Sequence, residues 1–157
     1  VFILLAISLL GFGALIPQDT VGACYGTSCR GLDPAVERDS QGRLCSTTAY
    51  TVYGGYTKSG TNGTVKNELR YSTGCASNWS RASVTANNSN TKWLYAKVWE
   101  KPSPGWNYYY YIGGNPLPVG SYCYTKMVSG TVATVSFVGI SSTSWSGPYN
   151  PSHQYEG

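Results

Sequence analysis

The sequence predicts an all-β domain, a small disulfide-stapled sandwich or partly open barrel of about seven short strands, preceded by an N-terminal hydrophobic helix. Short runs rich in Thr, Val, Tyr and Trp alternate with Gly, Asn and Pro, as strands alternate with turns. Beyond the first 16 residues no long stretch has helical periodicity. Five cysteines follow this apolar leader. In an exported domain, disulfide bonds between cysteines form and persist because the compartment is oxidising.

Strands are expected where β-branched and aromatic residues concentrate between turn residues. Thr61-Asn62-Gly63 predicts a tight turn because Asn and Gly accept positive φ. The two residues Ser129-Gly130 join apolar runs, which predicts a hairpin between segments 121–128 and 131–140. The expected strands are 46–53, 64–72, 80–86, 91–100, 108–112, 121–128 and 131–140.

Segment 91–100 carries different side chains on its two faces, because successive residues of a strand point to opposite sides. The aliphatic residues Leu94, Ala96 and Val98 share one face. The other face holds Trp93, Tyr95, Lys97 and Trp99. Both faces are therefore expected to be covered.

The leader, residues 1–23, predicts export. Residues 1–16 are apolar and uncharged, but shorter than the ~20 residues of a membrane span. Small residues before Cys24 suit a signal-peptidase site, and they also loosely resemble a lipobox. Two interpretations stay open: a cleaved signal peptide, or a retained anchor or assembly helix that contacts a membrane through residues 1–16. Both predict a secreted or cell-surface protein of bacterial type, with a β domain at 24–140 and an irregular tail at 141–157.

The charge distribution argues against a nucleic-acid partner. The chain has 11 Lys and Arg, 7 Asp and Glu, and a net charge of +4. The basic residues are spread from Arg30 to Lys126 without the concentrated stripe that nucleic-acid binding needs. Abundant Tyr and Gly with few charges suit a secreted β domain.

Four cysteines, Cys24, Cys29, Cys45 and Cys75, are expected to form two bridges. Three pairings are open, and loop closure favours Cys24 with Cys75 and Cys29 with Cys45. A metal site is the weaker alternative because Cys-x4-Cys without histidines is poor zinc spacing, and no cofactor is expected. The fifth, Cys123, is either unpaired and buried or a link between two chains.

No catalytic set is evident, so we expect no enzymatic activity. His153, the only histidine, lies in a Pro- and Asn-rich tail, where nothing would hold it against a nucleophile. Asp33 and Glu68 are the best candidates for a glycosidase pair. However, Asp33-Pro34 is typical of the start of a turn, and Glu68 alternates with Arg70 along one face of a strand. Both patterns favour structural roles over a catalytic pair.

A run of aromatic residues is the expected partner surface. Alternation sends Tyr108 and Tyr110 to one face and Tyr109 and Tyr111 to the other, so one pair should be exposed. Exposed aromatics bind glycans or proteins at low entropy cost. The candidate surface comprises Trp106, Tyr108, Tyr109, Tyr110 and Tyr111.

Two strings resemble the YjfA-like family, which consists of small secreted bacterial domains of unknown function. The first is Cys24-Tyr-Gly-Thr-Ser-Cys29-Arg-Gly-Leu-Asp-Pro34, followed by Cys45. The second runs from Glu68 to Arg81, Glu-Leu-Arg-Tyr-Ser-Thr-Gly-Cys-Ala-Ser-Asn-Trp-Ser-Arg, and a Met-Val hairpin comes later. The resemblance covers roughly residues 24–139 and implies the fold and export. It implies no particular activity, because none is established for the family. The chain departs from the family by lacking a cysteine near residues 137–139 and by an apparent insertion at 101–117.

The second string has two interpretations. In the first, it forms a binding face in which Arg70 or Arg81 meets an anion and Trp79 meets a sugar ring. In the second, Trp79 packs beside Cys75 and the arginines stack over aromatics.

These observations favour an exported, non-enzymatic surface or structural β protein that self-assembles into a filament or surface layer. The alternative is a secreted monomeric module that binds cell-wall or extracellular glycans. A secreted hydrolase ranks last.

Overall fold

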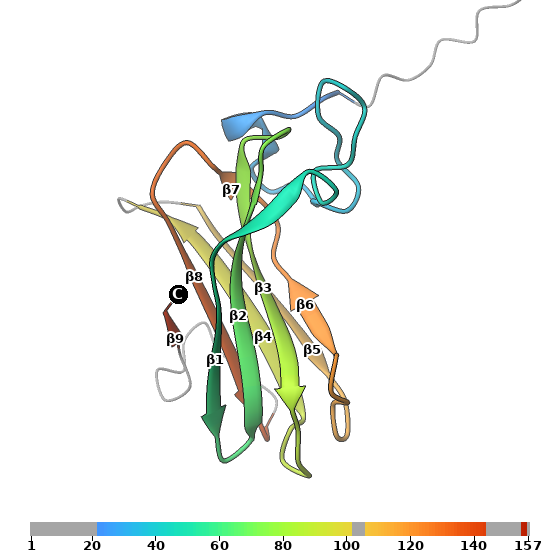
Figure 1. Cartoon of the computed structure of the whole chain (residues 1–157), viewed down its shortest axis with the longest axis vertical. Helices are drawn as coiled ribbons and strands as arrows, with labels where there is room; N and C mark the ends of the chain where they lie inside the picture. Colours follow the sequence, from blue (N-terminus) through green and yellow to red (C-terminus); the bar gives the residue numbers. More distant parts are fainter. Residues whose placement is uncertain (1–21, 102–105, 144–154, 157) are drawn as a thin grey trace, which may run out of the picture.

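The computed structural model describes residues 22–101, 106–143 and 155–156 (Figure 1). Within them lie one 3-10 turn and nine strands, and no α-helix. The elements are η1 (Gly26–Cys29), β1 (Ala49–Gly60), β2 (Gly63–Ser72), β3 (Ser77–Ala86), β4 (Trp93–Glu100), β5 (Asn107–Gly113), β6 (Tyr122–Tyr124), β7 (Val128–Ser129), β8 (Thr134–Ser141) and β9 (Tyr155–Glu156). Residues 1–21 of the leader lie outside the described residues, so the expected N-terminal helix stays a prediction.

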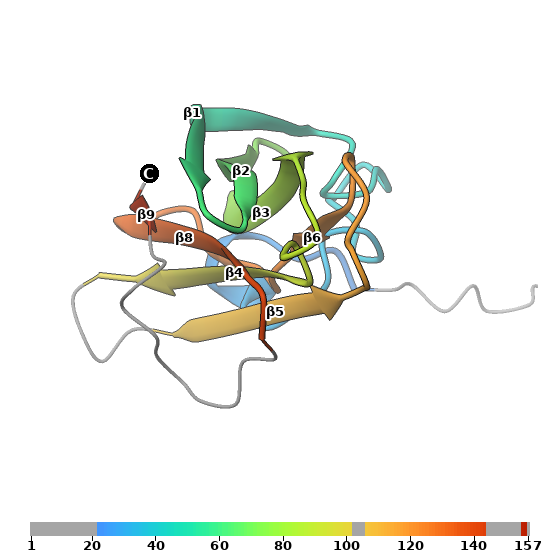
Figure 2. The ribbon, with the colours of Figure 1, turned by 90° about the horizontal axis from the view of Figure 1, so that it is seen from below.

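The strands form two antiparallel sheets that face each other as an open sandwich (Figure 2). The first sheet has the order β1-β2-β3-β6, with β7 also paired to β3. The second has the order β5-β4-β8-β9. The all-β prediction is confirmed in its sandwich form, and the two sheets do not close into a barrel. Residues 22–48 lie at one end of the sandwich, as the blue and cyan segment of Figure 1 shows.

Small and aliphatic side chains fill the space between the sheets. The inner face of β4 supplies the buried Leu94, Ala96 and Val98, as its alternation predicted. A polar link also joins the sheets, because Ser136 Oγ on β8 lies 2.7 Å from Asn67 Oδ1 on β2. The main core cluster is Val65, Ala82, Val84, Leu94, Ala96, Leu117, Cys123, Val138 and Ile140.

The outer face of β4 is covered too, as expected. Lys97 is only 8% exposed, and its Nζ lies 4.5 Å from the Trp99 ring centre and 5.0 Å from that of Tyr109. The ring centre of Phe137 on β8 lies 5.5 Å away. Cation–π attraction of about 2 kcal/mol in such a desolvated position offsets part of the cost of burying the charge.

The predicted hairpin around Ser129-Gly130 is wrong. β7 and β6 pair with β3 in the first sheet, whereas β8 pairs with β4 in the second, so the chain crosses between sheets here. The crossing needs glycine at 130, since an added Cβ would lie 2.5 Å from the Tyr71 ring. Two residues of the tail, which was expected to be irregular, form β9 against β8.

Candidate functional site

The candidate site lies on the outer face of the first sheet. Because Val65 and Asn67 of β2 face the core, the residues that alternate with them, Glu68 and Arg70, face outward. The antiparallel register sets Glu68 opposite Arg81 and Arg70 opposite Trp79 of β3. The charged and aromatic residues of the second string are thus direct cross-strand neighbours, the positions at which side chains interact most strongly.

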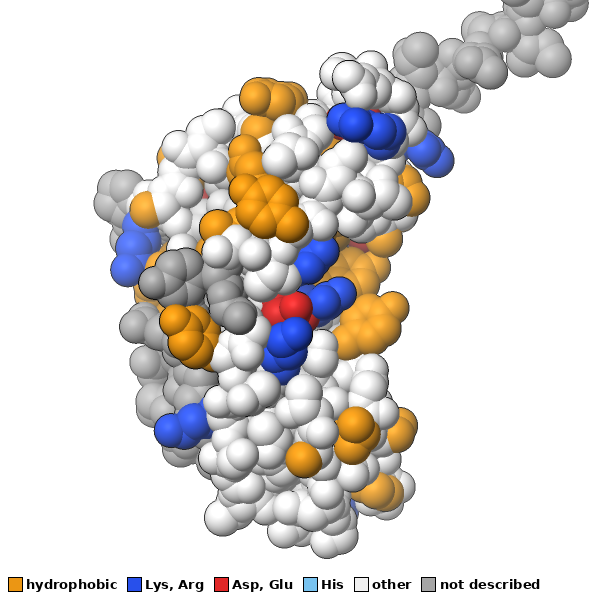
Figure 3. All heavy atoms as spheres, viewed as in Figure 1, with side chains coloured by type: hydrophobic (Ala, Val, Ile, Leu, Met, Phe, Trp, Pro, Cys, Tyr) orange, Lys and Arg blue, Asp and Glu red, His pale blue; other side chains and the backbone are white. Residues whose placement is uncertain are grey.

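Glu68 is the centre of a charge cluster. Arg81 donates from Nε to Glu68 Oε2 at 2.7 Å, and its second nitrogen lies 2.7 Å from the same oxygen. Lys66 Nζ lies 3.2 Å from Oε1, which also accepts a hydrogen bond from the Thr51 hydroxyl. Figure 3 shows these acidic atoms among basic ones in the middle of the face. Burial by itself would raise the pKa of Glu68, but Arg81 and Lys66 outweigh it and lower the pKa.

Arg70 is held differently from Arg81. Its Nη1 donates to Thr51 Oγ1 at 2.7 Å and its Nη2 to the Ala49 carbonyl at 2.9 Å, both on β1. Within the described residues it forms no ion pair. Burial lowers the pKa of Arg70, and the neighbouring charge of Arg81 lowers it further. Among the described residues the Arg70 guanidinium therefore donates its hydrogen bonds only to neutral groups, although the nearby charge of Glu68 also acts on it.

A cavity of about 270 Å³ opens beside the two arginines. Trp79, buried to 4% exposure against the cysteines and Met127, lines it from β3. The 59% exposed Tyr122, together with Tyr124, lines it from β6. We call this cavity the arginine–aromatic pocket, and its lining is Pro34, Ala35, Ser46, Arg70, Trp79, Arg81, Tyr122 and Tyr124.

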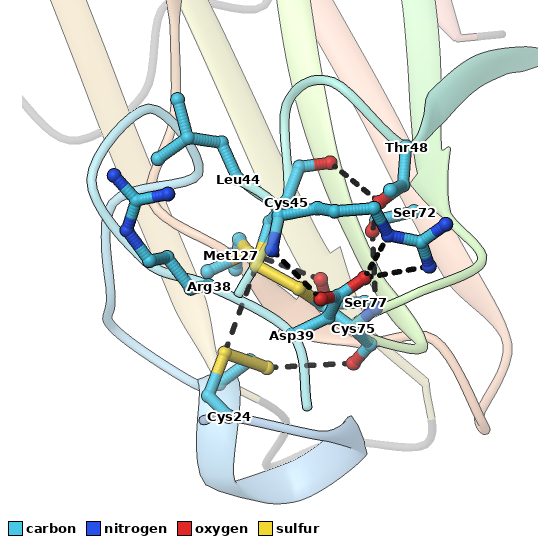
Figure 4. The surroundings of a disulfide bond; sticks show 12 residues. Cys24, Arg38, Asp39, Leu44, Cys45, Thr48, Ser72, Cys75, Ser77 and Met127 are labelled. Carbon is cyan, nitrogen blue, oxygen red and sulfur yellow. Dashed lines mark hydrogen bonds and ion pairs between the residues drawn. A yellow bond between two sulfur atoms is a disulfide. The ribbon is translucent and has the colours of Figure 1, made fainter. Parts of the chain in front are cut away.

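The remaining lining of the pocket, Pro34, Ala35 and Ser46, comes from the cysteine-rich segment. Figure 4 shows the disulfides of this segment with Asp39 beside them. The amide of Ser46 donates to the Pro34 carbonyl at 2.8 Å, which joins the two loops that line the pocket. Asp39 organises the neighbouring turn by accepting from the amides of Gln41 and Arg43. Burial opposes ionisation of Asp39, but the Arg43 side chain and these amides lower its pKa.

The cysteine-rich segment contains two disulfides, as expected, but the favoured pairing is wrong. The bridges are Cys24–Cys29 and Cys45–Cys75, not Cys24 with Cys75 and Cys29 with Cys45. The 3-10 turn η1 is the reason, because it brings the Cα atoms of Cys24 and Cys29 within 5.0 Å. All four sulfurs lie within 4.8 Å of one another, so the loop-closure argument found the cluster but not the partners.

The same clustering could suit a metal ion by position alone. A metal binds thiolates, however, and the two bridges occupy all four sulfurs. The cluster is therefore a structural element that packs under Trp79 and Met127.

Cys123 is the unpaired cysteine. It is 2% exposed in the core between the sheets, and its Sγ lies 3.9 Å from the Leu94 carbonyl. Burial raises the pKa of the thiol to about 12, so it stays protonated and unreactive at neutral pH. The structure therefore agrees with the first expectation for Cys123, an unpaired and buried thiol.

The four tyrosines of the aromatic run lie in β5, and successive tyrosines point to opposite faces of the sheet, as predicted. Tyr109 lies against Lys97, and Tyr111 lies 6.4 Å from Trp93, on the outer side of the second sheet. Tyr110 instead stacks on Tyr124, a lining residue of the pocket, with the ring centres 6.2 Å apart. Tyr108 is half-buried, with its hydroxyl next to Gly31, whereas Trp106 is exposed. The predicted surface therefore divides between two faces, and none of its five residues lines the arginine–aromatic pocket, although Tyr110 contacts the lining residue Tyr124.

The structure does not bring the predicted catalytic residues together. Asp33 lies 3.5 Å from Lys126 and lines a small neighbouring cavity with Tyr124, whereas Glu68 is enclosed by Arg81 and Lys66. Burial, together with Asp33, raises the pKa of Tyr124. His153 lies outside the described residues.

Tyr122, Tyr124 and Thr51 were missed in the sequence. The signal that identifies the two tyrosines is alternation around Cys123, which sends a buried cysteine inward and its neighbours outward. No comparable local signal marks Thr51, which gains its role by pairing directly with Arg70 across β1 and β2.

Comparisons of the chain with protein-family models, with curated proteins and with solved structures find no match.

Proposed function

We propose that this protein is an exported, non-enzymatic module that binds an extracellular glycan in the arginine–aromatic pocket. The observation that carries the proposal is the pocket itself, in which two guanidinium groups and Trp79 share one cavity with Tyr122 and Tyr124. Aromatic rings stack on the apolar faces of sugar rings, and guanidinium donors bind their oxygens. The cavity is at the small end of ligand sites, which fits one or two sugar residues.

The non-enzymatic part of the proposal is supported by the state of Glu68. A glycosidase needs one carboxyl group with a raised pKa that serves as general acid. Glu68 has a lowered pKa, and both of its oxygens are occupied by Arg81, Lys66 and Thr51. A carboxylate that is ionised and fully hydrogen-bonded in this way is suited to hold the arginine in place, and it is poorly suited to donate a proton.

Export is supported by the two disulfides, because bridges of this kind persist in extracytoplasmic compartments. Among the described residues no helix has the length and apolar character to cross a membrane.

We also propose membership of the YjfA-like family, which rests on the motif residues alone. In its support, the residues of the second string converge on one place, where Arg70 faces Trp79 and Trp79 packs on Cys75.

The proposal predicts that a glycan-binding signal depends on Tyr122 and not on Tyr111. Both are tyrosines on strands with similar exposure, 59% and 56%, but only Tyr122 lines the pocket. On a glycan array, Tyr122→Ala should weaken binding by about tenfold or more, the loss typical of an interface tyrosine. Tyr111→Ala should bind like the unmodified protein. Loss with Tyr111→Ala alone would place the ligand on β5, and no binding by the unmodified protein would contradict the function.

Self-assembly is the second candidate, and one observation favours it. Within the described residues β5 pairs with β4 alone, and it carries neither the charge nor the proline that usually protects an edge strand. A second copy could add its own strand there. A glycan-binding protein that sediments as a monomer would remove this candidate.

A further inference from the structure

We infer that the arginine–aromatic pocket takes an acidic sugar, a glycan residue with a carboxylate or sulfate group, and that Arg70 binds the anionic group. This inference rests on the proposed function and names its ligand class. Three features of the site carry it: the balance of charge, the free donors of Arg70, and the position of Trp79.

The balance of charge leaves Arg70 without a directly bound anion among the described residues. Lys66, Arg70 and Arg81 surround the single carboxylate of Glu68, so the cluster has a net charge of +2. Arg81 and Lys66 contact that carboxylate directly. Arg70 makes no direct hydrogen bond to it: the Thr51 hydroxyl accepts from Arg70 and donates to Glu68, and the charge of Glu68 acts on Arg70 only at a distance. A ligand anion would supply the missing negative charge in a partly buried place, where electrostatic attraction is stronger than in water.

Arg70 also keeps donors for such an anion. A guanidinium has five N–H groups, and the bonds to Thr51 and Ala49 use two of them. Both acceptors lie on β1, so the group is fixed on one side and its remaining donors need no reorganisation to bind a ligand. Planar donors of this kind match the oxygens of carboxylate and sulfate, in one or two hydrogen bonds.

A sugar ring can stack on the exposed Tyr122, and the floor of the pocket next to that charge is the buried Trp79. It sits directly opposite Arg70 in the register of β2 and β3, and both line the cavity. A ring stacked on the aromatic side of the pocket therefore brings its substituents to Arg70. The lining contains no Asp or Glu, so nothing in it competes with the ligand for the guanidinium.

The test compares matched acidic and neutral ligands by isothermal titration calorimetry. Oligogalacturonate is paired with its methyl ester, and dextran sulfate with dextran. The unmodified protein should bind one acidic member about 10- to 100-fold more tightly than its neutral partner, the range of one charged hydrogen-bonded contact. Arg70→Gln should remove this preference while binding to the neutral partner persists. Arg70→Lys, which keeps the charge without the planar donors, should retain part of the preference and serves if Arg70→Gln does not fold.

Arg38→Gln is the control, because it removes the same charge from an exposed side chain that bonds the Gly42 carbonyl outside the pocket. Its acid preference should equal that of the unmodified protein. A preference for either acidic ligand supports the inference and assigns the anionic group. Equal binding of acidic and neutral partners overturns the inference but leaves the proposed function standing. An equal loss in Arg38→Gln and Arg70→Gln also overturns it, and no binding to any of the four ligands overturns both.

Discussion

Removal of the Cys45–Cys75 bridge in a Cys45→Ala/Cys75→Ala variant is expected to lower the free energy of unfolding by about 3.6 kcal/mol. This bridge joins residues 30 apart, so its loss frees a long loop in the unfolded chain. It also ties the loop that carries Ser46 to the turn before β3. Urea denaturation followed by tryptophan fluorescence measures the change, and sugar binding should weaken along with stability.

The matched control is Cys24→Ala/Cys29→Ala, which removes a bridge between residues only 5 apart. Loop closure predicts a smaller loss, about 2 kcal/mol. Equal losses in the two variants, or a larger loss for the short loop, would contradict the loop-closure account of the two bridges.

Glu68→Gln is expected to destabilise the protein by about 2 kcal/mol at pH 7, because the change leaves Arg70 and Arg81 facing each other without a carboxylate. The figure is below that of a fully buried pair, since Arg81 and Lys66 are each 37% exposed and screened by solvent. The measurement is the free energy of unfolding of both proteins over a range of pH.

The pH dependence has a definite sign. The pKa of Glu68 is lowered in the folded protein, so its contribution is full above the unfolded pKa of about 4.3 and is lost as pH falls through the folded pKa. The difference between the unmodified protein and Glu68→Gln should therefore shrink in acid. Asp39, whose pKa is also lowered, affects both proteins alike. A difference that stays constant from pH 7 to pH 2 would contradict the role of Glu68.

Local patterns located most of the strands but not their partners. Nine strands are described where about seven were expected, and segment 121–128, expected as one strand, is divided into β6 and β7. The alternation of β4 was sufficient because a strand buried on both faces shows its two kinds of side chain directly in the sequence. Ser129-Gly130 was insufficient because the same two residues suit a hairpin or a crossing between sheets. The choice is made by the pairing of Ser129 with Ser77, a contact between distant segments. The disulfide partners depended in the same way on η1, a turn without a strong sequence signal.

Only part of the candidate site could be predicted from the sequence. Arg70, Trp79 and Arg81 could be placed on one face because they lie close together on two consecutive strands. The structural interpretation is confirmed for Trp79, which packs on the cysteines. The functional interpretation stays a proposal, which the cavity lined by Trp79 supports. The other lining, from β6 and from the loops at Pro34 and Ser46, reaches the pocket only in the folded chain.

The central claim is that the arginine–aromatic pocket binds an acidic sugar, and an NMR titration tests it most directly. The ¹⁵N signals to follow are Arg70 Nε, Trp79 Nε1 and the amide of Tyr124, with Arg38 Nε as reference. With added digalacturonate, or the sulfated disaccharide if sulfate is the preferred group, the first three should shift together and saturate at one concentration while Arg38 stays unchanged. Saturable shifts confined to β5, or no saturable shift at Arg70, would contradict the account.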